Sequence, residues 1–119
     1  MPRSLLVVDD DPAFRDLAAR VVRGWGHVVI GEAGSVADAL ARAAELRPNM
    51  ALVDIGLPDG DGFFLTAQLV AMPSPVRVVL ISVDDDRANA SAAHRAGASG
   101  FLAKDELTGD VLRQLIEGG

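Results

Sequence analysis

The sequence predicts an α/β fold in which a doubly wound sheet of five parallel strands is covered by helices on both faces. Short runs of entirely apolar residues recur along the chain, and such runs are typical of parallel strands that are buried on both sides. Each run is followed by a longer segment whose apolar residues recur at helical spacing. Because the chain has 119 residues, 50% of them hydrophobic, we expect a single domain that spans residues 1–119.

The first strand is expected at residues 5–8, which are apolar at every position. Asp11 followed by Pro12 is typical of a helix start, since Asp is a good N-cap and Pro fits the first helical position. The first helix would then end at Gly24 and Gly26. The second strand is expected at residues 27–30.

The next helix and strand bring the chain to an acidic loop. Ser35 is the expected N-cap of the second helix, and Pro48 stops it. The third strand is expected at residues 50–53, directly before Asp54. A Gly-rich and Asp-rich loop follows, and a third helix is predicted from near Phe63 to the Met-Pro pair at 72–73.

The last part of the chain repeats the pattern twice. A fourth strand is expected at residues 76–81 and a fifth at residues 100–103. The helix between them should open at residues 84–86, and its only apolar side chains are Ala. It can therefore bury little area, which makes it a candidate moving part. Thr108 is the expected cap of the last helix.

Charge and composition exclude several functions. Seventeen acidic and eleven basic residues give a net charge of -6, which opposes attraction to nucleic-acid phosphates or anionic membranes. We therefore expect no direct nucleic-acid partner and no membrane contact. The absence of Cys excludes thiolate catalysis and zinc-thiolate sites. The four residues before the first strand are too few for a signal peptide, so a cytoplasmic protein is expected.

Polar side chains follow four of the five predicted strands. They are Asp9 and Asp10, Asp54, Ser82 and Lys104, the only lysine of the chain. Each alone could be an ordinary turn or surface residue, but in a parallel sheet all would meet at one edge. The set suits phosphoryl transfer, in which clustered carboxylates hold Mg²⁺. Asp54 would be the nucleophile, while Ser82 and Lys104 would stabilise the transferred oxygens.

Four motifs then resemble the receiver domain of two-component response regulators: VVDDD, DIGLPDGDG, VLIS and GASGFLAKDE. The resemblance implies a flavodoxin-like fold with strand order 2-1-3-4-5. It also implies a phosphoacceptor signalling domain, to which a sensor histidine kinase or phosphotransfer protein donates a phosphoryl group. Mg²⁺ would be required and Asp54 would be the acceptor. A conformational change would then control an output or a partner.

The same resemblance implies individual roles. Asp9, Asp10 and Asp54 would hold Mg²⁺ together with the carbonyl of Gly56. Ser82 would be the switch hydroxyl, Phe101 the switch aromatic, and Lys104 the partner of the phosphoryl group. Such a domain is not an enzyme with an external substrate, although it takes part in catalysing its own phosphorylation and dephosphorylation. A homodimer through the fourth helix, fifth strand and fifth helix is a further expectation.

The residue after Lys104 narrows the resemblance. Many receivers have Pro there, whereas Asp105 in this chain is similar to receivers of LuxR-type regulators, which carry a C-terminal DNA-binding domain. Val83 replaces the more usual Ala beside the switch hydroxyl. Its extra bulk would narrow the approach to the site.

Two alternatives fit the sequence less well. A Mg²⁺-dependent phosphohydrolase of the haloacid dehalogenase type also uses Asp, Ser or Thr, and Lys. Its D-x-D pair matches the spacing of Asp9 and Asp11, but Ala13 does not match the pattern that follows. A flavin-binding module would need a hydroxyl-rich phosphate loop after the first strand, and three consecutive acids repel phosphate when no metal is bound. The receiver is therefore the preferred interpretation.

Overall fold

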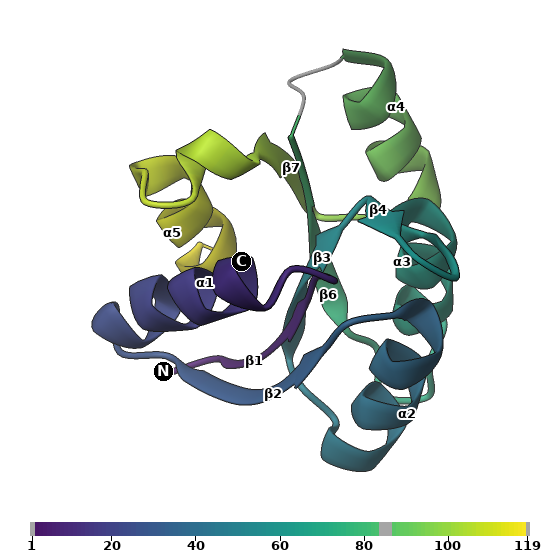
Figure 1. The fold of residues 1–119 in the computed structure, drawn as a ribbon, viewed down its shortest axis with the longest axis horizontal. Coiled ribbons are helices and arrows are strands. Elements are labelled where there is room, and N and C mark those ends of the chain that lie inside the picture. Colours follow the sequence, from purple (N-terminus) through teal and green to yellow (C-terminus); the bar gives the residue numbers. More distant parts are fainter. Residues whose placement is uncertain (1, 84–86, 119) are drawn as a thin grey trace.

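In the computed structural model, which describes residues 2–83 and 87–118, a parallel sheet lies between two layers of helices (Figure 1). The strands of this sheet are β1 (Ser4–Val8), β2 (Val28–Ala33), β3 (Met50–Asp54), β6 (Arg77–Ser82) and β7 (Gly100–Ala103). The helices are α1 (Pro12–Gly24), α2 (Val36–Leu46), α3 (Gly62–Val70), α4 (Arg87–Ala96) and α5 (Asp110–Glu117). A hairpin of β4 (Gly56–Leu57) and β5 (Gly60–Asp61) and the short 3₁₀ helix η1 (Lys104–Glu106) complete the fold.

The order of the strands is β2-β1-β3-β6-β7, and all neighbours are parallel. This confirms the predicted order, with β6 and β7 as the fourth and fifth strands of the main sheet. The direction in which successive strands are added to the sheet reverses at β1 and β3, which are neighbours. In such sheets a crevice opens there at the carboxyl ends of the strands. The predicted acids at the ends of β1 and β3 therefore lie at this point.

The core consists of two halves, one on each face of the sheet. Alternate residues of β1 point to opposite faces: Leu5 and Val7 pack toward α1 and α5, whereas Leu6 and Val8 pack toward α2 and α3. The central strands β3 and β6 divide their residues in the same way. Both faces are covered by helices (Figure 1), so the inner positions of these strands, residues 5–8, 50–53 and 78–81, are all apolar, as the sequence indicates.

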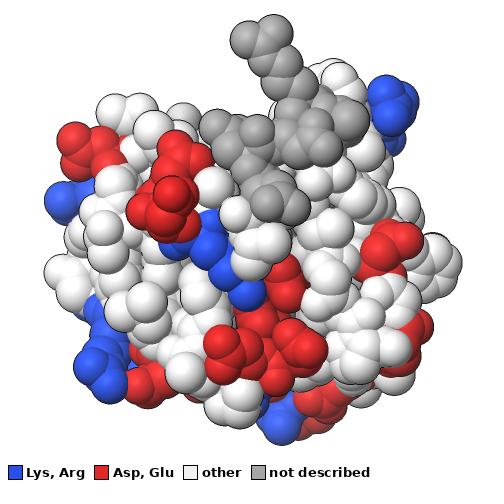
Figure 2. Space-filling view, turned by 45° about the horizontal axis from the view of Figure 1, so that its top comes forward, with Lys and Arg blue, Asp and Glu red and all other residues white. Residues whose placement is uncertain are grey.

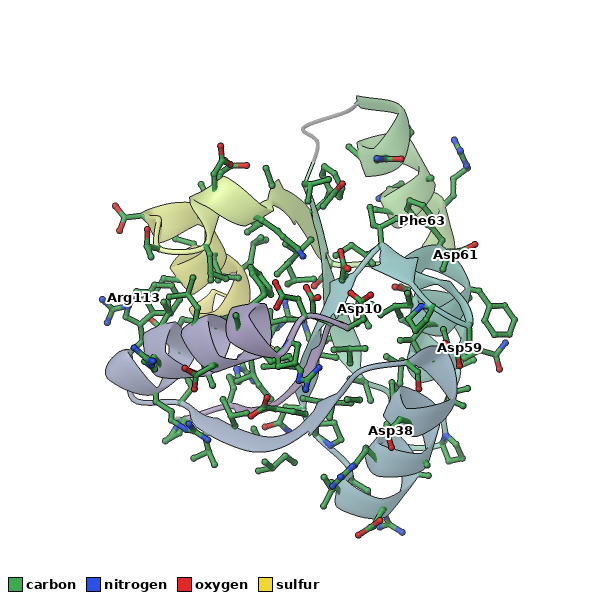
Figure 3. The ribbon with its side chains drawn as sticks, in the orientation of Figure 1. Asp10, Asp38, Asp59, Asp61, Phe63 and Arg113 are labelled. Atoms are coloured by element: carbon green, nitrogen blue, oxygen red, sulfur yellow. The ribbon has the colours of Figure 1, made fainter. Side chains whose placement is uncertain are left out.

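The predicted helix starts at Asp11 and Ser35 are confirmed. The side chain of Asp11 accepts a hydrogen bond from the backbone N–H of Ala13 at 3.0 Å, and that of Ser35 accepts one from Asp38 at 3.1 Å. Each satisfies a backbone N–H that has no partner within its helix. Figure 3 shows Asp38 on the exposed side of α2.

Several element boundaries differ from the prediction. Strand β2 begins at Val28 and continues to Ala33, because its pairing with β1 extends to the pair of Val8 and Ala33. Thr108 is not the cap of the last helix; Gly109 occupies the N-cap position of α5. The chain turns there through a hydrogen bond from the N–H of Gly109 to the carbonyl of Glu106 at 3.0 Å, which delays the helix by one residue. The predicted start of the fourth helix at residues 84–86 lies outside the described residues.

No helix in the described part of the chain is both long enough and apolar enough to cross a membrane.

Candidate functional site

Asp54 is the last residue of the central strand β3, and its side chain is only 11% exposed. The loop after it is held close to the strand, since the N–H of Gly62 donates to the carbonyl of Ile55 at 2.8 Å. A Cβ at Gly62 would lie 2.6 Å from the carbonyl oxygen of Asp54, so only glycine fits at this approach. The tight loop brings Gly62, the first residue of α3, into contact with the backbone of Asp54.

The environment of Asp54 raises its pKa from 3.8 to about 6. Burial is the main cause, because it disfavours the charged form, and the negative charge of Asp9 adds to it. The charge of Lys104 and a backbone hydrogen bond from Gly56 act in the opposite direction. Asp54 is therefore ionised near neutral pH but carries a charge that its surroundings only partly compensate.

Asp9 and Asp10 follow β1 and differ in exposure. Asp9 is buried, and one of its oxygens, Oδ1, accepts the backbone N–H of Asp11 at 2.8 Å. Asp10 is exposed, and Figure 3 shows it beside the loop that leads from β1 into α1. One carboxylate oxygen from each of Asp9, Asp10 and Asp54 lies within 4.8 Å of the others. The structure thus brings together the three acids that the sequence predicts at one edge.

Lys104 reaches this acidic cluster from the end of β7. Its Nζ lies 2.8 Å from Oδ2 of Asp9 and 3.9 Å from Oδ1 of Asp54. Desolvation lowers the pKa of Lys104, but the hydrogen bond to Asp9 and the charges of Asp54 and Asp9 together raise it above its ordinary value. The ammonium is therefore cationic throughout the physiological range. In Figure 2 basic atoms lie among the acidic side chains that gather on this face.

Ser82 and Phe101 lie on neighbouring strands. Ser82 is buried at the end of β6, opposite Ala103 in the β7 register, and therefore one residue from Lys104. Phe101 is only partly buried and packs against the half of the core below α4. A hollow of about 280 Å³ beside it is lined in part by Ala93, His94 and Phe101. Phe101 thus lies beside α4, and Ser82 lies on the strand that pairs with that of Phe101.

Gly56 lies in the hairpin directly after Asp54, and the acids that follow it shape the loop. Asp59 accepts the backbone N–H groups of Val36 and Ala37 at 2.7 Å and 3.0 Å, so it ties the hairpin to the start of α2. Asp61 accepts the N–H of Phe64 at 2.7 Å and begins α3. Figure 3 shows Asp59 and Asp61 on the α2 and α3 side of the molecule, away from Asp10.

Two residues of α1 contact the site although the sequence analysis did not assign them to it. The ring of Phe14 lies over Nζ of Lys104, with 4.4 Å between Nζ and the ring centroid. Arg15 donates from Nη1 to the carbonyl of Asp9 at 2.6 Å and pairs through Nε with Glu32 at 3.2 Å. Only their position in the sequence could have indicated this role, because both lie in the first turn of α1, directly after the acidic loop.

Two further residues, His27 and Trp25, lie away from the acidic cluster. His27 is buried at the opposite edge of the sheet, where Nδ1 accepts the N–H of Arg3 at 3.0 Å and Nε2 pairs with Glu117 at 2.9 Å. Trp25 packs partly buried against the core near Arg113, which Figure 3 shows on α5. Neither residue contributes to the acidic cluster.

Comparisons with known proteins agree with this geometry. Residues 5–117 match the family model described as the response regulator receiver domain. The DNA-binding transcriptional activator DevR/DosR of Mycobacterium tuberculosis is 46% identical over 120 residues, which cover 100% of this chain and 55% of that protein. The chain thus spans about half the length of the curated relatives it matches.

Solved structures give the same result. The signal receiver domain of NarL from Mycobacterium tuberculosis is 36% identical, with a TM-score of 0.84 and 96% of each chain covered. A LuxR-family two-component response regulator from Aurantimonas sp. SI85-9A1 is 26% identical, with a TM-score of 0.84, and the match covers 97% of this chain and 86% of that one.

Proposed function

Because the chain belongs to the response regulator receiver domains, we propose that it accepts a phosphoryl group on Asp54 and changes conformation in response. The donor would be a sensor histidine kinase or a phosphotransfer protein. The observation that carries this proposal is the position of Asp54, which lies at the same edge of the sheet as two further acids and the ammonium of Lys104. Asp9 shares these neighbours, but it is fully buried, and its oxygens are engaged by the N–H of Asp11 and by Lys104.

The proposed step needs no separate general base. A carboxylate oxygen of Asp54 forms the new bond to phosphorus, the bond from phosphorus to the donor breaks, and the donor leaves with the electron pair. The pKa of Asp54 is about 6, so at neutral pH its carboxylate is already ionised and can act as the nucleophile. Its partial burial also leaves the carboxylate poorly solvated, so little water has to be removed before it attacks phosphorus.

Lys104 and Ser82 are proposed to stabilise the transferred group. Lys104 already lies 3.9 Å from the Asp54 carboxylate, so its ammonium is within reach of oxygens that join Asp54. Ser82 lies at the end of the adjacent strand, and its hydroxyl can donate to a phosphoryl oxygen. Together they place positive charge and a donor where negative charge increases during transfer.

The acidic cluster fits Mg²⁺. Carboxylate oxygens within 4.8 Å of one another match the hard oxygen donors that this ion prefers, and like charges at this spacing need a cation. Asp9, Asp10 and Asp54, with the carbonyl of Gly56, would hold the ion. Both oxygens of Asp9 already have protein partners, so we assign Asp9 chiefly to orientation and Asp10 and Asp54 to direct ligation. When bound, the ion supplies positive charge to the phosphoryl oxygens.

The conformational response is proposed to pass through Ser82, Phe101 and α4. The hollow beside Phe101 allows its ring to change position without overpacking. Helix α4 contributes only Ala93 to the buried core among its residues with described burial, so little packing opposes its movement. A homodimer through α4, β7 and α5 would use the same surface. We propose that this segment itself contacts no nucleic acid, because its net charge is -6.

Phosphorylation by acetyl phosphate tests the proposal. With Mg²⁺, intact mass should increase by one phosphoryl group, and Asp54→Asn should abolish the increase. Asp59→Asn is the matched control, since it changes a carboxylate of the same loop that caps α2, and it should retain the adduct. An adduct that survives Asp54→Asn would place the nucleophile elsewhere, and continuous turnover of a phosphate ester would favour the phosphohydrolase.

A further inference from the structure

The ring of Phe14 covers one side of the only lysine in the chain. The distance of 4.4 Å between Nζ of Lys104 and the ring centroid is well within the range of a cation–π interaction. Phe14 belongs to the first turn of α1, whereas Lys104 follows β7. The contact therefore joins the first helix to the last strand across the acidic cluster.

The ring adds a second restraint on Lys104 besides its ion pair with Asp9. A lysine has a flexible four-carbon stem and a strongly hydrated ammonium, and this one is 22% exposed. Asp9 and Asp54 attract it through charge, at 2.8 Å and 3.9 Å. Phe14 is partly buried and packs against the core half below α1 and α5, so its ring is a fixed wall on another side. Ring and acids together restrict the ammonium to the neighbourhood of Asp54.

We propose that Phe14 is a positioning residue for Lys104, and that its ring holds the ammonium where it can receive the transferred phosphoryl oxygens. This inference rests on the proposed function. With acetyl phosphate, an oxygen of Asp54 bonds to phosphorus, the bond from phosphorus to the acetyl oxygen breaks, and acetate leaves with the electron pair. An ammonium that is already in place when the donor arrives lowers the barrier to this step.

The contact can be tested without phosphorylation. Because Lys104 is the only lysine, protein grown with ¹³C-labelled lysine gives one set of side-chain NMR signals. The ring current of Phe14 should displace the Cε proton signal, and Phe14→Leu should return it toward the position of a free lysine. Phe64→Leu is the matched control, since Phe64 is 54% exposed on α3. A signal that Phe14→Leu leaves unchanged would overturn the inference.

The kinetic role is tested with acetyl phosphate and Mg²⁺. Phe14→Leu should lower the limiting rate of phosphorylation roughly threefold to tenfold, the effect of losing one cation–π interaction. The half-saturating concentration of acetyl phosphate should stay unchanged, because the ring does not contact the donor. Phe14→Tyr keeps the aromatic face and should restore the rate. If Phe14→Leu does not fold by thermal melt, Phe14→Met replaces it. A parent-like rate in the folded variant would overturn the role.

A double-mutant cycle separates positioning from packing. In the Lys104→Met background, Phe14→Leu should cause no further loss of rate, because no ammonium remains to be positioned. An equal loss in both backgrounds would mean that Phe14 acts through the fold, and would overturn the inference. If the parent protein takes no phosphoryl group, the proposed function fails, whereas the lysine signal still decides whether the contact holds Lys104.

Discussion

Nζ of Lys104 lies 2.8 Å from Oδ2 of Asp9, more than an ångström closer than to the carboxylate of the proposed nucleophile. Asp9 is buried, and its other oxygen is already engaged by the N–H of Asp11. The lysine therefore compensates a buried charge in the unphosphorylated protein. Transfer to Asp54 would offer it a more highly charged partner nearby, so the same ammonium links stability to signalling.

Lys104→Met should destabilise the protein as well as impair phosphorylation. It leaves the buried carboxylate of Asp9 without a cation, and breaking such a pair typically costs about 3 kcal/mol or more. Urea denaturation at neutral pH should show a lower midpoint with an unchanged slope. Adding Asp9→Asn to the variant should recover most of the lost stability, because it removes the unpaired charge. If the double variant is no more stable than Lys104→Met alone, Asp9 does not depend on the lysine.

The raised pKa of Asp54 predicts the sign of a pH effect. An acid whose folded-state pKa exceeds its unfolded value stabilises the fold fully below the unfolded value and loses this contribution as pH rises through the folded pKa. For Asp54 this window runs from 3.8 to about 6. Above it, in chelator, Asp54→Asn should be more stable than the parent by roughly 1 to 3 kcal/mol.

Denaturation of both proteins across this pH range measures the difference. The advantage of Asp54→Asn should shrink as the pH falls from about 6 and should vanish below 3.8, where the parent carboxyl becomes neutral in both states. A constant difference would mean that the substitution acts through packing and not through charge. Glu45→Gln, an exposed change on α2, should show no such dependence.

The sequence predicted most of the fold because its strands are buried on both faces. Residues 5–8 and 78–81 are unbroken apolar runs, and such runs can be recognised without knowing which strand they pair with. Strand β2 was predicted too short because it lies at the edge of the sheet, where Gly31 and Glu32 can continue the ladder while they interrupt the apolar run. The hairpin of β4 and β5 was missed because two-residue strands leave no periodic pattern.

The candidate site was predictable to a different extent. Topology alone brings the ends of parallel strands to one edge, so Asp9, Asp10, Asp54 and Lys104 could be grouped from sequence. Which partner each would choose could not be predicted, because this depends on side-chain packing between segments far apart in the chain. The contact of Phe14 with Lys104 is such a case.

Phosphorylation should alter amide exchange in α4 and β7 and leave β1 and β3 unchanged. A shift from mostly inactive to mostly active requires about 5.5 kcal/mol of differential stabilisation. Charge-assisted hydrogen bonds from Ser82 and Lys104 contribute roughly 1.5 to 3 kcal/mol each. Exchange measured by mass spectrometry with and without acetyl phosphate should therefore differ between Arg87 and Lys104. Equal protection there in a fully phosphorylated sample would contradict the proposed switch.

Asp10 gives the most direct test of the metal site. It is exposed and makes no hydrogen bond or ion pair within residues 2–83 and 87–118, so it has little structural role. Without Mg²⁺ its charge repels Asp9 and Asp54, so Asp10→Asn should raise the melting temperature in chelator. Mg²⁺ should stabilise the parent by about 2.7 kcal/mol at a hundred times its dissociation constant, since it binds only the folded state. The variant should lose most of this gain.

Thermal melts of parent and Asp10→Asn, each with chelator and with Mg²⁺, provide the four values required. Asp38→Asn is a suitable control, because it removes an acid of α2 that lies outside the cluster and should leave the response to Mg²⁺ intact. The two effects of Asp10→Asn have opposite signs, which no general loss of stability can reproduce. If the parent does not respond to Mg²⁺, or the variant responds equally, then these acids serve the fold, and the positive charge at Asp54 comes from Lys104 alone.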